Sequence, residues 1–76
     1  MDDILNMLEN IRPEFDFKNS QNFIEDGFLD SFDIITLVDM LEEKYGVKID
    51  GLDIIPENFS GVNQISALVR KSGAMV

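Results

Sequence analysis

The segment from residue 30 to residue 46 constrains the fold more than any other part of the chain. Its apolar residues recur every three or four positions, which places them on one face of an α-helix. They are Ile34, Leu37, Val38, Leu41 and Tyr45. Asp30 and Ser31 are of the types that begin helices, and Gly46 is of the type that ends them. The pattern predicts a helix over residues 31–45.

A second apolar stripe lies near the start of the chain. It consists of Ile4, Leu5, Leu8 and Ile11, and its spacing predicts a helix over residues 2–12. Arg12 would then lie in the last turn, where a cation interacts favourably with the helix dipole. Pro13 lacks the backbone N–H group that a continuing helix needs, so it ends the segment.

The C-terminal part of the chain predicts one short helix and one longer helix. Pro56 is of the type that opens a helical turn, and this turn would end near Phe59. Ser60 has a side chain suited to the N-cap of a last helix over residues 61–72. The apolar stripe of this last helix consists of Val62, Ile65, Leu68 and Val69. Residues 73–76 are expected to fray.

Residues 13–30 show no periodicity and predict a long first loop. Their apolar members are Phe15, Phe17, Phe23, Ile24, Phe28 and Leu29. Because long loops without a role are unusual, this content indicates a loop that lies across the core. Residues 47–50 alternate in polarity, but four residues cannot form a sheet alone. We therefore expect an all-α bundle of three main helices plus one short helix, in a single domain over residues 1–76.

Charge and composition exclude several classes of function. The chain of 76 residues has 15 acidic and 6 basic residues, a formal net charge of −9, and neither histidine nor cysteine. That charge repels the phosphates of nucleic acids and favours partners with basic surfaces. Without histidine or cysteine there is no thiol nucleophile and no zinc–thiolate site, and the commonest general base is missing. We expect neither catalysis by the chain nor a resident metal ion.

The sequence also indicates where the protein is found. No stretch approaches the roughly 18 consecutive apolar residues of a membrane-spanning helix. The first residues, Met1, Asp2 and Asp3, lack the basic region of a signal peptide. We therefore expect no membrane span, a cytoplasmic location and a monomer.

One face of the helix predicted over residues 31–45 is suited to a partner. At about 100° per residue, the residues opposite the core or beside that direction are Phe32, Asp33, Thr36, Asp39, Met40 and Glu43. We expect Ile35 to belong to the same partner-binding surface. Apolar side chains ringed by carboxylates fit a basic, partly apolar partner. The alternative is an acidic face that is only solvated.

Ser31 has two interpretations at the start of this helix. The plain one is an N-cap serine. The other is an exposed hydroxyl that becomes modified, because a phosphate ester there would meet unpaired backbone N–H groups and the positive end of the helix dipole. Asp30 would repel that phosphate, so its role would be to contact a metal ion or basic residues of an enzyme.

Two stretches of the chain resemble the acyl carrier proteins. Residues 27–33 have the sequence GFLDSFD, and residues 37–47 have the sequence LVDMLEEKYGV. In that family an Asp-Ser-Leu motif carries 4'-phosphopantetheine on its serine, and the thiol of this arm holds the acyl group as a thioester. The resemblance covers nearly the whole chain, because the helices and the long loop come in the order of the family.

The resemblance implies a function for each residue of the motif. Ser31 would be the attachment residue for 4'-phosphopantetheine, and Asp30 would be its motif partner. A phosphopantetheinyl transferase would load the arm from coenzyme A. Acyl- or aminoacyl-loading enzymes and acyl-using enzymes would then bind the helix face at positions that include Phe32, Asp33, Met40 and Glu43.

Three departures from the family pattern concern the cargo. Phe32 replaces the more usual leucine, as in D-alanyl carrier proteins and other carriers, and Thr36 stands where fatty-acid carriers commonly have an acid. Residues 51–58 form a slightly longer stretch than in the best-known members. An acyl carrier and an aminoacyl carrier of the D-alanyl or peptidyl kind both fit. The remaining alternative is an acidic helical interaction module without a prosthetic group.

Overall fold

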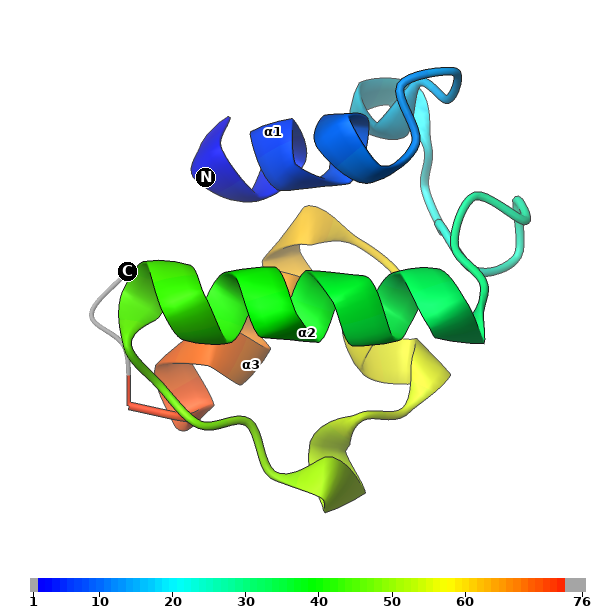
Figure 1. Ribbon diagram of the computed structural model, residues 1–76. Coiled ribbons are helices and arrows are strands. Elements are labelled where there is room, and N and C mark those ends of the chain that lie inside the picture. The colour runs from blue at the N-terminus through cyan, green and yellow to red at the C-terminus, as the bar shows by residue number, and fades with distance from the viewer. Residues whose placement is uncertain (1, 74–76) are drawn as a thin grey trace.

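The computed structural model describes residues 2–73, and this part of the chain contains helices and turns but no strand. The α-helices are α1 (Asp2–Ile11), α2 (Ser31–Tyr45) and α3 (Val62–Lys71) (Figure 1). Short 3₁₀ turns connect them, namely η1 (Phe17–Asn19), η2 (Gly51–Asp53) and η3 (Pro56–Phe59). The all-α fold is confirmed, and the expected short helix is the 3₁₀ turn η3. Of the residues expected to fray, 74–76 lie outside the described residues.

Helix α2 has the bounds that its sequence predicts. Asp30 is its N-cap, so Ser31 is the first helical residue rather than the cap. At the other end Gly46 adopts a left-handed conformation with φ of 66°, and its N–H donates to the carbonyl of Glu42. A side chain at Gly46 would be strained in this conformation, which explains why glycine ends the helix here.

The ends of the other two helices differ from the predictions. Helix α1 ends at Ile11, and Arg12 follows it with its N–H still bonded to the carbonyl of Leu8 at 2.9 Å. The N-cap of α3 is Gly61, so the prediction of Ser60 as N-cap is wrong. The Ser60 hydroxyl donates to the carbonyl of Glu57, while its own carbonyl accepts from Phe23. Ser60 therefore closes η3 and holds the first loop.

The long first loop packs into the core, as its aromatic content indicates. Phe17, Phe23 and Leu29 are buried. The rings of Phe15 and Phe28 stack with centroids 4.5 Å apart, and Phe17 meets Phe23 edge-on at 5.1 Å. The turn η1 forms inside this loop, where no sequence period predicts it. Because Leu29 is buried directly before Asp30, the loop is anchored in the core where α2 begins.

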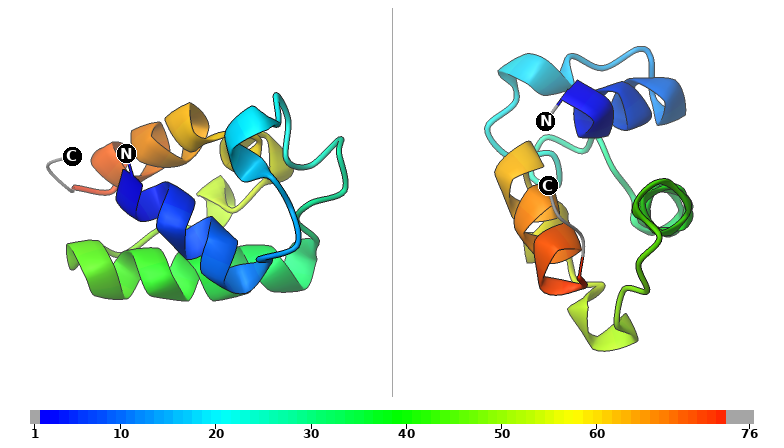
Figure 2. Two further views of the ribbon diagram at one scale, coloured as in Figure 1. Left: turned by 90° about the horizontal axis from the view of Figure 1, so that it is seen from above. Right: turned by 90° about the vertical axis from the view of Figure 1, so that its left-hand side faces the viewer.

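The three helices enclose one apolar core. In the left view of Figure 2, α1 lies across both α2 and α3. The right view shows α2 end-on and α3 from the side, so these two helices cross at an angle. The residues buried between them include Ile4, Leu8, Leu37, Leu41, Phe59, Ile65 and Val69. The start of α2 lies at the opposite end of the molecule from the end of α3 (Figure 1).

Candidate functional site

The candidate site begins at Ser31, the first residue of α2. The backbone is extended at Asp30 and becomes helical at Ser31. Ser31 is exposed, and no group within residues 2–73 forms a hydrogen bond with its hydroxyl. The hydroxyl therefore faces solvent at a helix start and is open to an approaching enzyme.

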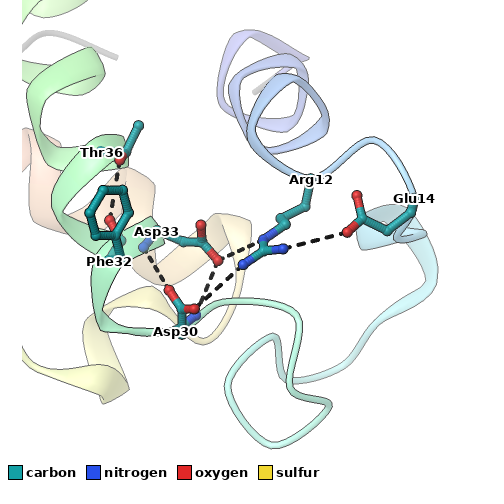
Figure 3. Close-up of polar contacts among 6 residues, drawn as sticks. All are labelled: Arg12, Glu14, Asp30, Phe32, Asp33 and Thr36. Carbon is teal, nitrogen blue, oxygen red and sulfur yellow. Dashed lines mark hydrogen bonds and ion pairs between the residues drawn. The ribbon is translucent and has the colours of Figure 1, made fainter.

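Two carboxylates hold the backbone on either side of Ser31. Asp30 Oδ1 accepts from the backbone N–H of Asp33 at 2.8 Å, and Asp33 Oδ2 accepts from the backbone N–H of Asp30 at 3.3 Å (Figure 3). This reciprocal pair is a capping box that satisfies two N–H groups at the helix start. Ser31 lies inside the loop that the two bonds close, so its position depends on them.

Arg12 joins this capping box from the end of α1. Its Nε donates to Asp33 Oδ2 at 2.8 Å, and its Nη2 donates to Asp30 Oδ2 at 3.4 Å (Figure 3). Its Nη1 lies 3.6 Å from Glu14 Oε2. One guanidinium thus contacts both carboxylates of the capping box, which a planar fork of donors permits.

The expectation that Asp33 belongs to the exposed face of α2 is wrong. Asp33 is only 6% exposed, and its carboxylate points toward Arg12, which follows α1 (Figure 3). A carboxylate buried to this extent needs a charged or hydrogen-bonded partner, and Arg12 supplies one. The sequence pattern did not reveal this pair, because Arg12 precedes Asp33 by 21 residues. The helix dipole of α1 also gave Arg12 a sufficient role at the end of that helix.

These contacts also change the acidity of the site. The pKa of Asp30 lies below its usual value, chiefly because the N–H of Asp33 donates to its carboxylate and also because Arg12 is nearby. The pKa of Arg12 is raised, first by its hydrogen bond with Asp33 and then by the charge of Asp33. Both groups stay charged at neutral pH.

The lowered pKa of Asp30 predicts a pH dependence of stability. Because the ionised form is favoured in the folded state, its contribution is present above the unfolded-state value of 3.8 and is lost as pH falls through the lower folded-state pKa. Carboxyl-carbon NMR of the folded protein should give Asp30 a midpoint below 3.8. Arg12→Met should raise this midpoint. A titration midpoint of Asp30 at or above pH 3.8 in the unaltered protein would contradict the lowered pKa.

Four of the other six residues of the proposed partner face are exposed as expected, namely Phe32, Ile35, Asp39 and Glu43. Phe32 is 77% exposed and Ile35 is 60% exposed, so neither lies under the first loop. Asp39 and Glu43 are exposed, whereas Thr36 and Met40 are partly buried. The hydroxyl of Thr36 donates to the carbonyl of Phe32 within the helix (Figure 3). We keep the name partner face for Phe32, Ile35, Thr36, Asp39, Met40 and Glu43.

Two further surface features were not predicted from the sequence. A shallow groove of about 480 Å³ lies beside the partner face, lined by Met7, Met40, Glu43 and Lys44. It extends that face from α2 to α1.

Leu52 in η2 is 86% exposed, and Ile55 before η3 is also exposed. Residues 47–55 have no helical period, so no pattern indicated which of their apolar side chains face solvent.

Comparison with known families adds to this geometry. The family model described as a phosphopantetheine attachment site matches residues 3–69 of the chain. The chain belongs to this family of carrier domains. No curated protein and no solved structure gives a significant match.

Membership of the family fixes the cofactor. A carrier domain bears 4'-phosphopantetheine covalently on a serine, and it interacts with a phosphopantetheinyl transferase and with partner enzymes. Such domains are generally not catalytic themselves.

None of the helices within residues 2–73 has the length and apolar character needed to cross a bilayer.

The start of α2 fits this prosthetic group. Ser31 offers an exposed hydroxyl that no other group in residues 2–73 engages. The first turn of a helix carries N–H groups that have no helical acceptor, and these favour a nearby phosphate.

Within residues 2–73, no group of three or more acidic side chains is arranged to hold a metal ion.

Proposed function

We propose that this carrier domain, spanning residues 1–76, holds an acyl group as a thioester on 4'-phosphopantetheine attached to Ser31. The observation that carries the proposal is a comparison of the five serines of the chain. Ser31 alone among them is both exposed and free of hydrogen bonds to residues 2–73. An attachment residue must present its oxygen to an enzyme, and Ser31 does so at a helix start.

The other four serines have engaged or buried side chains. The hydroxyl of Ser20 donates to Asp26, that of Ser60 to the carbonyl of Glu57, and that of Ser72 to the carbonyl of Leu68. Ser66 is only 5% exposed and has interactions of its own. Modification at any of these positions would require breaking a bond or opening the core.

The residues around Ser31 have separate roles in this proposal. The Ser31 oxygen receives the phosphopantetheine that the transferase takes from coenzyme A. The positive end of the α2 dipole favours the negative charge of the resulting phosphodiester. Asp30 opposes that charge, so its exposed carboxylate serves instead to contact a metal ion or basic groups of the transferase. When bound, phosphopantetheine supplies the terminal thiol that forms the thioester.

The partner face gives this carrier its recognition surface. Phe32 and Ile35 offer apolar contact area, while Asp39 and Glu43 attract basic surfaces. The catalysis then belongs to the partner enzymes, and the chain itself is not an enzyme.

A monomer in the cytoplasm is part of the proposal. Sedimentation of the purified protein would test its oligomeric state, and fractionation of its native host would test its location.

An aminoacyl carrier of the D-alanyl or peptidyl kind is the second candidate. The observation that favours it is the exposed Phe32 next to Ser31. D-alanyl carriers, among other carriers, have a phenylalanine after the serine. Both candidates use the same arm and differ only in the group on the thiol. Mass analysis of the thioester on protein isolated from its native host distinguishes them.

Mass spectrometry tests the attachment itself. The purified chain is incubated with coenzyme A and a phosphopantetheinyl transferase, and its intact mass is measured. We expect the gain of one phosphopantetheinyl group, located by fragmentation on the peptide that contains Ser31. A chain that gains no group with several transferases would contradict the proposal and would favour the acidic interaction module.

Reversing charges on the partner face should slow partner reactions without unfolding the protein. We expect Asp39→Lys combined with Glu43→Lys to lower the rate of loading, most clearly at low salt, where charges about 10 Å apart still interact. The measurement is the loading rate as a function of ionic strength.

The control reverses two charges elsewhere. Glu9→Lys combined with Glu57→Lys changes the net charge equally at exposed positions in α1 and η3. This variant should be loaded at a rate close to that of the unaltered protein. Equal slowing in both variants would show that net charge, and not the partner face, governs recognition.

A further inference from the structure

The guanidinium of Arg12 connects the end of α1 with the residues on both sides of Ser31. We propose that Arg12 is a positioning residue for the modification of Ser31, acting through Asp33 and Asp30. This inference rests on the proposed attachment at Ser31. It goes beyond the sequence motif around Ser31, because Arg12 follows α1 and precedes Asp30 by 18 residues.

The first step of the argument concerns Asp33. This carboxylate is buried, and its Oδ2 accepts from both Arg12 Nε and the backbone N–H of Asp30. Without the cation, a buried negative charge would remain without compensation. Asp33 would then turn toward water, and its bond to the N–H of Asp30 would be lost.

The second step concerns the backbone that carries Ser31. The capping box holds Asp30 and Asp33 to each other, and Ser31 lies between them. The first turn of a helix frays when its N–H groups lose their partners. Loss of the Arg12 contact would therefore let the attachment oxygen move relative to the rest of α2.

The third step concerns the placement of Arg12 itself. Its N–H is fixed to the carbonyl of Leu8, and Pro13 stops α1 directly after it. The side chain leaves the helix end and reaches both carboxylates, with its remaining nitrogen near Glu14 (Figure 3). A lysine at this position has one ammonium group and cannot reproduce the fork of donors.

Position matters because transfer to a serine oxygen needs that oxygen aligned with the reacting group. A displacement of about 1 Å can cost a factor of about 100 in rate. The partner-face residues after the first turn of α2, from Ile35 to Glu43, lie outside the capping box and do not depend on Arg12. Loss of Arg12 should therefore affect the rate of the transfer step more than the binding of the transferase.

The test measures kcat and KM for loading by a transferase and coenzyme A. It is run at a temperature at which circular dichroism shows each variant to be folded. We expect Arg12→Met to lower kcat by about 10-fold or more while KM changes by less than about 2-fold. Arg12→Lys should give a kcat between those of Arg12→Met and the unaltered protein.

Lys71→Met is the matched control. It removes one cation and one short ion pair, in which Lys71 Nζ lies 2.8 Å from Asp53 Oδ1, at the end of α3 opposite the start of α2 (Figure 1). This variant should lose little stability, because the Lys71 side chain is mostly exposed, and it should keep its kcat. If Arg12 contributed only to overall stability, Arg12→Met would keep its kcat as Lys71→Met does, because both variants are measured while folded.

A double variant tests whether Arg12 acts through Asp33. In Arg12→Met with Asp33→Asn, the buried charge is removed and the amide oxygen at position 33 can still accept from the N–H of Asp30. We expect kcat to recover toward the value of the unaltered protein. A double variant no faster than Arg12→Met, or an Arg12→Met variant with normal kcat, would overturn the inference. If the unaltered protein is not loaded at all, the proposed function fails instead.

Discussion

Replacing Ser31 with alanine is expected to abolish loading with phosphopantetheine while the fold remains intact. The variant lacks the oxygen to which the prosthetic group would be attached. The stability should change by less than about 0.5 kcal/mol, because the Ser31 side chain is exposed and Asp30 rather than Ser31 caps α2. Intact-mass analysis after incubation with coenzyme A and a transferase measures the loading, and a thermal melt measures the stability.

The other exposed or partly exposed serines provide the controls. Ser20→Ala, Ser60→Ala and Ser72→Ala should each be loaded like the unaltered protein, because their hydroxyls serve hydrogen bonds within the fold. Continued loading of Ser31→Ala would show that the attachment residue is another serine. Loss of folding in Ser31→Ala would contradict the assignment of the cap to Asp30.

The largest loss of stability is expected for Phe17→Ala in the first loop. Phe17 is 1% exposed and meets the rings of Phe15, Phe23 and Phe28 edge-on, at centroid distances of 6.4, 5.1 and 5.5 Å. Truncation of a buried phenylalanine costs about 3–5 kcal/mol, because it removes buried apolar area and leaves a cavity. Since small domains have a total stability of about 5–15 kcal/mol, much of it would be lost. Urea unfolding followed by circular dichroism measures the difference.

Phe32→Ala is the matched control for this prediction. It makes the same substitution at a phenylalanine that is 77% exposed, so its stability should change by less than about 0.5 kcal/mol. Its effect should be on reactions with partner enzymes, because Phe32 belongs to the partner face. A loss of stability in Phe32→Ala as large as in Phe17→Ala would show that Phe32 packs against the core in solution.

The sequence by itself determined the features that depend on neighbouring residues. The bounds of α2 follow from its apolar period together with Asp30 and Gly46, and all of these act within a few residues along the chain. The motif around Ser31 could be recognised for the same reason, because its residues are consecutive. The end of α1 before Pro13 is equally local, since proline removes a backbone donor.

The tertiary structure alone decided the features that depend on residues distant in sequence. Ser60 is suited to the N-cap of α3 by its residue type, but its carbonyl accepts from the N–H of Phe23 in the first loop and the N-cap is Gly61. The buried carboxylate of Asp33 is paired with Arg12, a partner that the helical pattern of α2 does not contain. Periodicity gives the direction of a side chain from its own helix, but packing of another helix against that side decides whether a charge there is solvated or paired.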